Sequence, residues 1–352
     1  MVHQIINDYN LRNGGAQKIA LSLHFGMINS GLQSRIVSLT KNEENIQDGI
    51  NLKCNGPYGF LPFFRLFLYC QKQVSKGDVI HVHLFPTSFY LAIAKKLFVL
   101  RGCKVVFTEH NTHNRRRNLI FFKPLNKFIY SSFDKVVAIS RGVEISLLRE
   151  FSYLNKKMTT ITNGVELSGY CKSERNQSVP VKIVSVGRLH EQKNYELAIN
   201  GISLLTTLNF EYHIAGEGEK LGELKKLAER LSVQDKVYFH GFVNDISEFL
   251  STKDIFLMTS RWEGFGLALV EAMNQSVPSI VSNVEGVRDI LGADNKCGFL
   301  VPLDSPKDLA GHLSTLINNP DLRVRMGRAA YLRSKEFSMD KMVQKYFKIY
   351  FE

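Results

Sequence analysis

The sequence lacks the features that mark disulfide-rich, zinc-binding and membrane-spanning proteins. Its five cysteines are odd in number and form no CxxC pair, which argues against a disulfide framework or a zinc site and fits a reducing compartment. No basic segment followed by an apolar core opens the chain, and no run reaches the ~18 apolar residues that span a bilayer. We therefore expect a cytoplasmic protein without a signal peptide.

Internal repeats, low-complexity segments and collagen-like glycine periodicity are absent as well. Hydrophobic residues make up 44% of the chain and charged residues 22%, which is ordinary globular usage and excludes a disordered or fibrous protein. At ~150 residues per domain, the 352 residues predict two domains.

Positive charge is in excess, and the excess is confined to one half of the chain. The net charge is +12. Residues 1–165 hold 22 Lys and Arg against 9 Asp and Glu, or +13, whereas residues 166–352 hold 23 against 24, or −1. This asymmetry predicts an anionic partner for the first half, which could be nucleic acid, an anionic membrane surface or a phosphorylated substrate. The alternative is charge that serves only solubility.

Short apolar runs alternate with amphipathic segments in both halves, which predicts βαβ units and parallel sheets covered on both faces. Strands are expected at His3–Asn7, Ser34–Leu39, Val79–His83, Val105–Thr108, Lys135–Ile139, Lys182–Val186, Glu211–Ala215, Val237–His240, Asp254–Met258 and Ser279–Ser282. Helices are expected at Ala16–Asn29, Tyr195–Leu205, Leu221–Leu231, Leu267–Asn274 and Met339–Phe351. The predicted fold class is α/β, with two doubly wound domains.

A polar stretch with Gly and Pro, residues 164–180, predicts the domain boundary. We expect an N-terminal domain at 1–165, a C-terminal domain at 181–335, and a C-terminal helix at 336–352 that either closes the second domain or packs back on the first. Parallel sheets bind ligands beyond the carboxyl ends of their strands, so two such domains facing each other would share one cleft. Motifs that directly follow strands are therefore the candidates for chemistry.

The first motif is a glycine pair that opens a helix after the first strand. Gly14, Gly15 and Ala16 would let the backbone approach a ligand closely, and the helix N-terminus offers free N–H groups to an anion. The GxGxxG dinucleotide fingerprint is absent. The alternative is an ordinary turn.

The second motif is a pair of cations after the strand Lys182–Val186. Arg188 and Lys193 are five residues apart, and they can converge on a doubly charged group. The guanidinium can bind phosphate oxygens through two hydrogen bonds, and the ammonium acts as a point charge. The alternative is two solvated surface charges.

The third motif is the strongest and spans residues 260–273. Glu263 falls in a glycine-punctuated loop after a strand, and Glu271 falls in a helix that is otherwise almost wholly apolar. A carboxylate on such a helix needs hydrogen-bond donors, and the vicinal hydroxyls of a sugar or ribose are suitable ones. Phosphates would then lie near the N–H groups of Gly264, Phe265, Gly266 and Leu267. The alternative is that Glu271 pairs with a neighbouring Arg or Lys.

Together these motifs resemble the family 4 glycosyltransferases of the GT-B fold, of the type that builds bacterial polysaccharides and glycolipids. The similar segments are GGAQ at 14–17, TEHN at 108–111, AISRGV at 138–143, TNGVE at 162–166, VGRLHEQKN at 186–194, HIAGEGE at 213–219 and SRWEGFGLALVEAM at 260–273. The resemblance implies two Rossmann-like doubly wound domains facing an interdomain cleft. It also implies a retaining enzyme of hexosyltransferase type, which moves a sugar from a nucleotide-sugar donor to an acceptor hydroxyl without a metal or other cofactor.

The same resemblance implies roles for individual residues. Gly15 and its neighbours would approach the donor diphosphate, and Arg188 and Lys193 would neutralise it and stabilise the leaving nucleotide. Glu263 would hydrogen-bond the donor sugar. Glu271 would accept hydrogen bonds from the ribose hydroxyls.

Two further positions follow from the resemblance. His110, in the TEHN segment, would line the donor sugar and the acceptor side, either as a base or only as a hydrogen-bond partner. Gly216, in the GEGE loop, would lie near the nucleotide. The chain departs from the family after residue 273, since a single Gly286 stands where a Gly-Gly pair is common, and this weakens any detailed prediction for residues 283–287.

Elementary electrostatics supports such a site independently of the family resemblance. Departure of a nucleoside diphosphate develops negative charge, which cationic side chains can stabilise in place of a divalent metal. Since no carboxylate stands out as a covalent nucleophile, we favour attack by the acceptor hydroxyl on the same face of the sugar, assisted by the departing phosphate.

Two segments of the basic half interleave aromatic residues with cations, at 60–69 and 115–123. This composition suits a segment at the interface of an anionic membrane, although the first segment could equally be a core helix. Three consecutive arginines, at 115–117, are hard to bury. We therefore expect peripheral association with the inner face of the cell membrane, and a glycan or lipid-linked acceptor.

Two other functions stay open on the sequence. One is a nucleotide-sugar epimerase or phosphorylase on the same architecture. The other is a non-catalytic, basic nucleic-acid-binding protein, but no nucleic-acid-reading motif is present and this function leaves Glu263 and Glu271 unexplained. We therefore expect no nucleic-acid partner.

Overall fold

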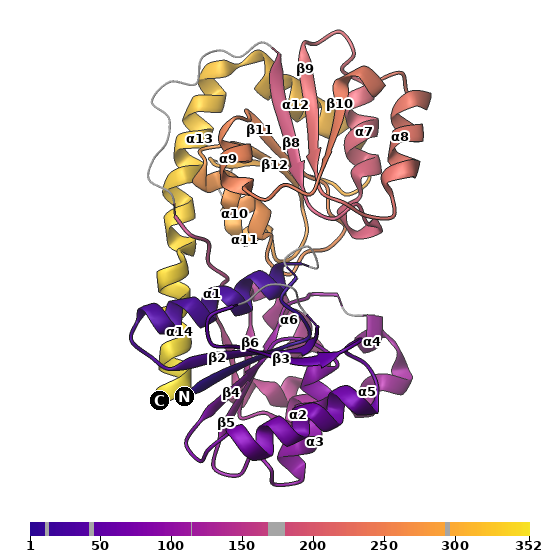
Figure 1. The fold of residues 1–352 in the computed structure, drawn as a ribbon. Coiled ribbons are helices and arrows are strands. Elements are labelled where there is room, and N and C mark those ends of the chain that lie inside the picture. The colour runs from indigo at the N-terminus through magenta and orange to yellow at the C-terminus, as the bar shows by residue number, and fades with distance from the viewer. Residues whose placement is uncertain (11–13, 42–45, 114, 168–179, 293–295) are drawn as a thin grey trace. The chain divides into compact units, whose positions relative to one another are not determined.

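The protein is described by a computed structural model that covers residues 1–10, 14–41, 46–113, 115–167, 180–292 and 296–352. It divides into two compact α/β units (Figure 1). The first unit comprises Met1–Gly164 together with Met339–Glu352, and the second comprises Val165–Ser338.

The first unit is built on a parallel sheet whose described strands run in the order β3-β2-β1-β4-β5-β6-β7. The strands are β1 (Val2–Ile6), β2 (Ser34–Thr40), β3 (Gly49–Cys54), β4 (Val79–Val82), β5 (Lys104–Glu109), β6 (Lys135–Ala138) and β7 (Met158–Thr160). The connecting helices are α1 (Gly15–Asn29), α2 (Phe60–Gln73), α3 (Thr87–Lys96), α4 (Arg115–Asn118), α5 (Lys123–Ser132) and α6 (Arg141–Glu150), with short 3-10 turns η2 (Ile120–Phe122) and η3 (Ser152–Lys156). All residues of β1 and β4 are buried, as expected for central strands covered on both faces.

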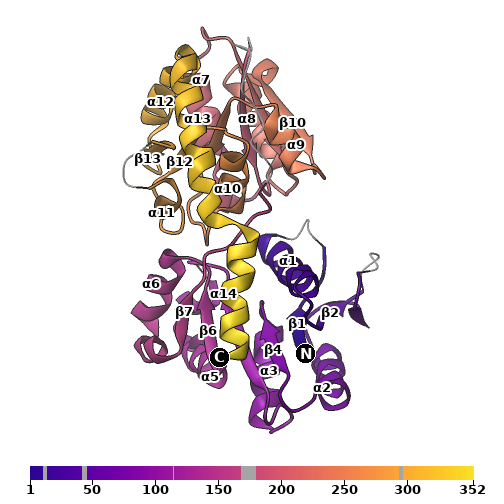
Figure 2. The same ribbon diagram turned by 90° about the vertical axis from the view of Figure 1, so that its left-hand side faces the viewer.

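The C-terminal helix α14 (Met339–Phe351) belongs to the first unit and packs against α1, as Figure 2 shows. The contact depends on Gly26 of α1, because a Cβ atom there would lie 2.5 Å from Cγ2 of Val343. Tyr346 and Tyr350 of α14 are buried beneath the sheet strands they contact. The last residues of the chain therefore complete the core of the unit in which the chain begins.

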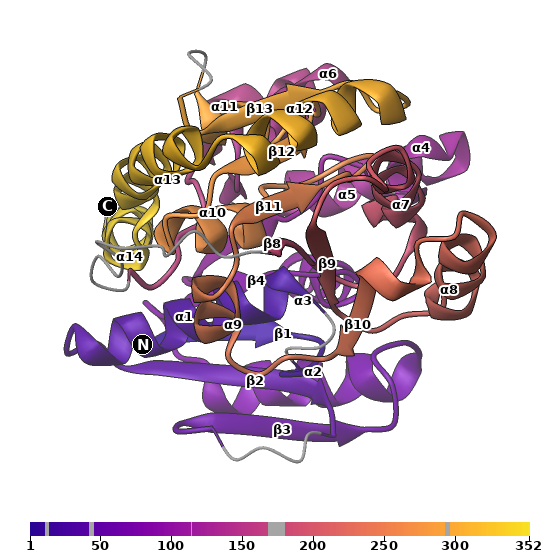
Figure 3. The same cartoon turned by 90° about the horizontal axis from the view of Figure 1, so that it is seen from above.

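The second unit also has a parallel sheet, with its described strands in the order β10-β9-β8-β11-β12-β13, and part of this order is visible in Figure 3. The strands are β8 (Val181–Val186), β9 (Phe210–Ala215), β10 (Val237–Gly241), β11 (Ile255–Met258), β12 (Ser279–Ser282) and β13 (Gly298–Val301). The helices are α7 (Tyr195–Ser203), α8 (Leu221–Arg230), α9 (Ile246–Ser251), α10 (Leu267–Asn274), α11 (Arg288–Leu291), α12 (Pro306–Asn318) and α13 (Pro320–Ser334), with 3-10 turns η4 (Glu191–Lys193), η5 (Gln234–Lys236) and η6 (Lys335–Phe337).

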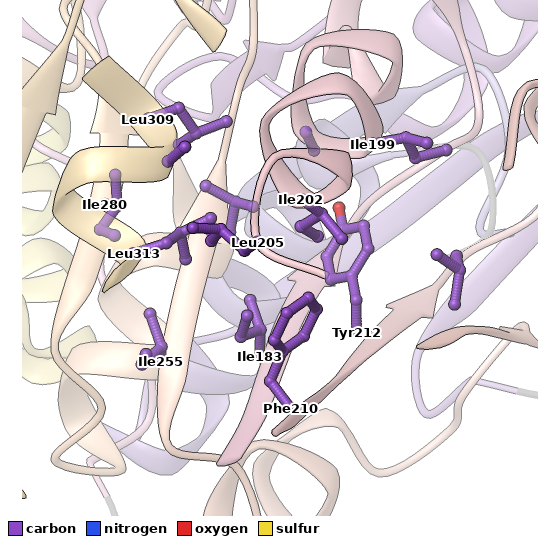
Figure 4. Close-up of a cluster of buried hydrophobic side chains, with 14 of the residues drawn as sticks. Ile183, Ile199, Ile202, Leu205, Phe210, Tyr212, Ile255, Ile280, Leu309 and Leu313 are labelled. Atoms are coloured by element: carbon purple, nitrogen blue, oxygen red, sulfur yellow. The ribbon is translucent and has the colours of Figure 1, made fainter. Parts of the chain in front are cut away.

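A large apolar core lies between this sheet and the helices α7, α8 and α12 (Figure 4). Ile183 and Ile255 come from neighbouring strands, and Ile202 and Leu313 come from α7 and α12; none of the four exposes its side chain. Each fully buried aliphatic side chain of this kind contributes roughly 1.5–3 kcal/mol to folding. The core holds the sheet rigid behind the loops at its carboxyl edge.

The sequence predicted the central strands within one or two residues but missed β3, β7 and β13. Each of these lies toward or at a sheet edge. Half-exposed or short edge strands carry a weak apolar pattern, and β7 has only three residues, none of them buried. Among the described helices, none is both long enough and apolar enough to cross a membrane.

Both sheets contain a topological switch point, where the chain leaves one side of a central strand and returns on the other. It lies between β1 and β4 in the first unit and between β8 and β11 in the second. Open α/β sheets bind ligands beyond the carboxyl ends of the strands at such points. A ligand would therefore bind at the loops after these four strands, and the predicted site residues should lie there.

Candidate active site

In the second unit, the loops after β8 and β11 are joined directly across the switch point. The Arg261 amide donates to the Gln192 carbonyl at 2.8 Å, and the Gln192 side chain donates to the Trp262 carbonyl at 2.9 Å. The Thr259 hydroxyl donates to the Lys193 carbonyl at 3.0 Å. These bonds hold the second motif, GRLHEQK at 187–193, and the beginning of the third motif, at 260–273, as one rigid platform.

Lys193 and Glu263 meet on this platform. The Lys193 ammonium lies 2.6 Å from Oε1 of Glu263, and the same oxygen accepts a 2.7 Å hydrogen bond from the Ser260 hydroxyl. The side chain of Glu263 is 8% exposed and that of Lys193 is 20% exposed. The family resemblance implied separate roles for these residues, one on the phosphate and one on the sugar, and did not indicate that they form a nearly buried ion pair.

Two glycines allow this arrangement. Gly187 has φ +149°, and a Cβ atom there would lie 2.8 Å from Cε of Lys193, so the lysine side chain occupies the space that a side chain at 187 would fill. Gly216 has φ +154°, and its Cβ would lie 1.9 Å from the Gly187 carbonyl oxygen. The GEGE loop after β9 therefore rests directly on the backbone of the loop after β8.

Arg188 follows β8, and its exposed side chain makes no hydrogen bond or ion pair with another described residue. It differs in this from Lys193, whose charge is already opposed by Glu263. An exposed guanidinium without an internal partner is free to bind phosphate oxygens in a bidentate manner.

The loop after β11 leads into α10 through the glycine-rich turn of the third motif. Gly264, Phe265 and Gly266 are buried, and Gly266 caps the helix in the left-handed conformation with φ +91° and ψ +54°. Leu267 is the first residue of α10, where backbone N–H groups have no helical partner. Glu271, the fifth residue of the helix, is half-buried.

Gly286 supports the same loop from the other side. It has φ +90°, and a Cβ atom there would lie 2.5 Å from the Glu263 carbonyl oxygen. The loop that departs from the family pattern therefore still contacts the third motif, and it does so through its single glycine.

In the first unit, the glycine motif stands at the N-terminus of α1. Gly14 has φ +143° and precedes the helix, which begins at Gly15 and continues through Ala16. The preceding Asn13 lies outside the described residues. The Asn7 side chain donates to the Phe85 carbonyl at 2.9 Å, which ties the loop after β1 to the loop after β4 at the switch point.

His110 follows β5 and is 8% exposed. Its Nε2 lies 3.2 Å from Nδ1 of His83, and Nε2 of His83 lies 2.8 Å from the side-chain oxygen of Gln4. Burial lowers the pKa of His110 to about 3, so its imidazole is neutral at physiological pH. Sequence analysis singled out His110 but missed His83 and Gln4, although a buried polar residue within an apolar strand was a usable signal for both.

The structure contradicts one premise of the membrane hypothesis. Arg117 was expected to be too costly to bury, yet it is 4% exposed. It donates to the Ser146 hydroxyl at 2.9 Å and lies 3.8 Å from the Glu150 carboxylate. The carboxylate and the acceptors of its Nη2 group offset part of the desolvation, while Nε and Nη1 make no hydrogen bond to a described residue.

Within the ranges that the structure describes, no three or more His, Cys, Asp or Glu side chains are grouped so that they could hold a metal ion. Metal independence of the reaction stays a prediction.

Two family profiles match the chain and together span most of it. The profile described as Glycosyltransferase Family 4 matches residues 13–168, and the one described as Glycosyl transferases group 1 matches residues 172–333. The chain belongs to glycosyltransferase family 4. It is an enzyme, a glycosyltransferase, and the family recognised from the sequence motifs is confirmed.

Two curated relatives illustrate the similarity of this glycosyltransferase. One, from Campylobacter jejuni, is N-acetylgalactosamine-N,N'-diacetylbacillosaminyl-diphospho-undecaprenol 4-alpha-N-acetylgalactosaminyltransferase, 27% identical over 265 residues, or 72% of this chain and 71% of the relative. The other, from Escherichia coli, is UDP-Gal:alpha-D-GlcNAc-diphosphoundecaprenol alpha-1,3-galactosyltransferase, 26% identical over 276 residues, or 73% of this chain and 70% of the relative.

Among solved structures, a variant of S. aureus TarM in complex with fondaparinux, alpha-GlcNAc-glycerol and UDP is similar to this glycosyltransferase with a TM-score of 0.84. It is 14% identical and covers 100% of this chain and 99% of its own. The GT-B fold predicted from the sequence is confirmed. The roles of the individual site residues stay predictions.

Proposed function

We propose that this glycosyltransferase moves a sugar from a uridine diphosphate sugar to a hydroxyl group of a lipid-linked or polysaccharide glycan, with retention of the anomeric configuration. The C. jejuni and E. coli relatives are named for acceptors on diphospho-undecaprenol, and the E. coli relative and the TarM complex are named with UDP. These names support the class of donor and acceptor for this chain.

The observation that carries the proposal is the platform at the switch point of the second unit. An exposed Arg188, the ammonium of Lys193 and the N-terminus of α10 all lie on the loops after β8 and β11. Cations together with unpaired helix N–H groups form an anion site that suits a diphosphate. Glu271, half-buried and one turn into α10, would accept hydrogen bonds from the ribose hydroxyls.

The same groups explain how the reaction proceeds without a metal. Negative charge develops on the nucleoside diphosphate as the glycosidic bond breaks, and Arg188 and Lys193 stabilise it there. A single pre-oriented donor of this kind contributes about 10²–10³ in rate. Glu263 holds Lys193 in place before the donor binds, so little reorganisation is needed at the moment of reaction.

In the first unit, His110 is proposed to contact a sugar hydroxyl. Its low pKa makes it a hydrogen-bond partner rather than a proton-accepting base at neutral pH, because protonating the buried imidazole is unfavourable. The hydroxyl that attacks the sugar would then lose its proton to the departing phosphate, which agrees with attack on the same face.

A basic, aromatic surface of the first unit is proposed to meet the membrane that carries the acceptor. Phe60 and Phe64 on α2 are 75% and 44% exposed, while Leu66 on the opposite face is buried. Beside α2 lies a cavity of about 840 Å³ whose lining includes Lys41, Lys53, Arg65 and Lys72. Exposed aromatics next to several cations are typical of peripheral binding to anionic lipid.

The direct test of the proposed function is a transfer assay with the full chain. UDP-sugars would be offered with diphospholipid-linked glycans, and the anomeric configuration of the product would be read by proton NMR, with EDTA present in a parallel series. We expect a retained anomer and an unchanged rate in EDTA. An inverted anomer, or conversion of the nucleotide sugar without any acceptor, would contradict the proposal.

Membrane association is tested separately by co-sedimentation with vesicles. The full chain should bind anionic vesicles at low salt, and F60S/F64S should bind less. L332S removes an apolar side chain of the second unit that is 56% exposed, between the values for Phe60 and Phe64, and serves as the control. Absence of binding to anionic vesicles, or equal loss in the control, would remove this part of the proposal.

A further inference from the structure

A hydrogen-bonded network of buried polar side chains runs through the first unit from the C-terminal helix to His110. It begins at Tyr346, whose hydroxyl lies 3.0 Å from that of Thr108, and Thr108 lies 2.7 Å from Nε2 of His81. Tyr350 lies 2.6 Å from Nδ1 of His81 and accepts a 3.1 Å hydrogen bond from the Gln4 amide. His83 then connects Gln4 to His110.

The hydrogen bonds of this network determine which nitrogen of His110 carries the proton. With its NH₂ group on Tyr350, the Gln4 amide presents its oxygen to Nε2 of His83, so that Nε2 must be the donor. A neutral imidazole has one donor and one acceptor, so Nδ1 of His83 is an acceptor. His110 must therefore donate from Nε2 to His83.

His83 and His110 are both neutral, so the tautomer of each ring decides which of its nitrogens donates. His83 is 1% exposed, and burial lowers its pKa well below the ordinary value. The adjacent carboxylate of Glu109 does not reach either ring in this network, since it accepts hydrogen bonds from the Tyr130 hydroxyl and the Asn111 amide. The remaining ring nitrogen, Nδ1 of His110, has no hydrogen bond to a described residue.

We propose that Gln4 and His83 are positioning residues that hold His110 as the Nε2–H tautomer, so that Nδ1 offers a lone pair to a sugar hydroxyl. The inference rests on the proposed function only for the identity of that hydroxyl. In the opposite tautomer, Nδ1 would carry a proton and His110 would donate to the substrate instead of accepting from it. A hydrogen bond to the ring nitrogen that faces away from the substrate sets the orientation and the tautomer of a functional histidine.

The involvement of α14 follows from the same geometry. The Tyr350 hydroxyl, with its own proton donated to Nδ1 of His81, can only accept from Gln4 and therefore selects the NH₂ end of the amide, from 346 residues away in sequence. Without it, the amide has no reason to prefer one orientation over the other, and the tautomers of His83 and His110 would both be free to reverse. The closing helix thus contributes to the site through Tyr350.

The experiment is nitrogen-15 NMR of the full chain labelled at histidine, with His110 assigned by its loss in H110Q. We expect protonated Nε2 and unprotonated Nδ1 at His110 in the wild type. Q4M, of similar volume, and Y350F, which removes only one oxygen atom, should each give a mixture of tautomers. Q275M, which replaces another buried glutamine in the second unit, is the control and should leave His110 unchanged.

Kinetics provide the second readout. Loss of one neutral hydrogen bond should lower kcat of Y350F about fivefold, with little change in the KM for the nucleotide sugar, because the nucleotide site lies on residues of the second unit. An unchanged His110 tautomer in both Q4M and Y350F, or a wild-type His110 protonated at Nδ1, would overturn the inference. Those NMR outcomes are read without turnover, so they are distinct from failure of the transfer assay.

Discussion

The Lys193 ammonium and the Glu263 carboxylate lie 2.6 Å apart in a nearly buried pair, although the residues are seventy positions apart and follow different strands. The pair fixes the position of a cation at the carboxyl edge of the second unit's sheet. It also means that Glu263 cannot be removed without affecting Lys193, and this shapes how the site should be tested.

Replacing Lys193 should lower both turnover and stability. K193Q removes a charge from the leaving diphosphate, and we expect kcat to fall about 10²–10³-fold. K193Q and E263A each break the buried pair and leave an uncompensated charge, which destabilises by about 3–5 kcal/mol, so neither variant alone separates catalysis from folding. A double-mutant cycle with K193Q and E263Q, followed by both kcat and denaturant unfolding, separates the two effects. Additive changes in both quantities would show that the residues do not act together.

Removal of the carboxylate of Glu271 should specifically weaken nucleotide binding. E271Q keeps the size of the side chain but loses the charged acceptor for the ribose hydroxyls, and hydrogen bonds to charged groups contribute about 1.5–3 kcal/mol. We expect the Kd for UDP to rise by at least tenfold in calorimetric titration. E229Q changes an exposed glutamate on α8 and should bind UDP as the wild type does. Equal affinity of E271Q and the wild type would show that Glu271 has another role.

Gly216 should not tolerate a side chain. In G216A the new methyl group would lie 1.9 Å from the Gly187 carbonyl oxygen, so the loops after β8 and β9 would have to separate. We expect about 1–3 kcal/mol of destabilisation and weaker nucleotide binding. G222A lies in helix α8 with no atom near the added methyl, and it should stabilise by up to about 1 kcal/mol. The reverse order of the two variants in thermal unfolding would contradict the structure.

The first unit should lose stability as the pH falls below about 6.5. Burial lowers the pKa of His81, His83 and His110, so the folded unit binds fewer protons than the unfolded chain. The stabilisation is complete above the unfolded pKa and is lost on acidification toward the folded values, at up to about 1.4 kcal/mol per pH unit for each histidine. Hydrogen exchange of the β4 backbone amides between pH 7 and pH 5 measures the stability of the first unit.

H110Q supplies the control for this pH dependence. It removes one of the titrating groups, so the slope of stability against pH should decrease by up to about 1.4 kcal/mol per pH unit. A slope that is identical in H110Q and the wild type would show that His110 is protonated in the folded protein.

The sequence predicted the helices and strands that a local pattern of apolar residues defines. The boundaries of α10 were predicted correctly because a run of apolar residues begins directly after a glycine pair, and β12 was predicted correctly because it is short, apolar and bounded by Pro278. β3 was missed because it is largely half-exposed, and β7 because it has only three residues. β13 is as short and apolar as β12, and its local pattern does not explain why it was missed.

The site was predictable as a set of residues but not as a set of contacts. The second and third motifs indicated Lys193 and Glu263, but nothing in either motif alone indicates that the two side chains form a pair. His83 and Gln4 were missed for the same reason, since each acts through a partner from another strand. Long-range pairing is set by the order of strands in the sheet, which the sequence pattern alone does not determine.

The central claim is that a nucleoside diphosphate binds at the carboxyl edge of the second unit's sheet through Arg188 and Lys193. Calorimetric titration of the full chain with UDP tests it most directly, with R188Q as the variant and R325Q, which alters an exposed arginine on α13, as the control. We predict one binding site in the wild type and in R325Q, with affinity reduced at least tenfold in R188Q. Undiminished binding by R188Q, or no binding of UDP by the wild type, would contradict the account.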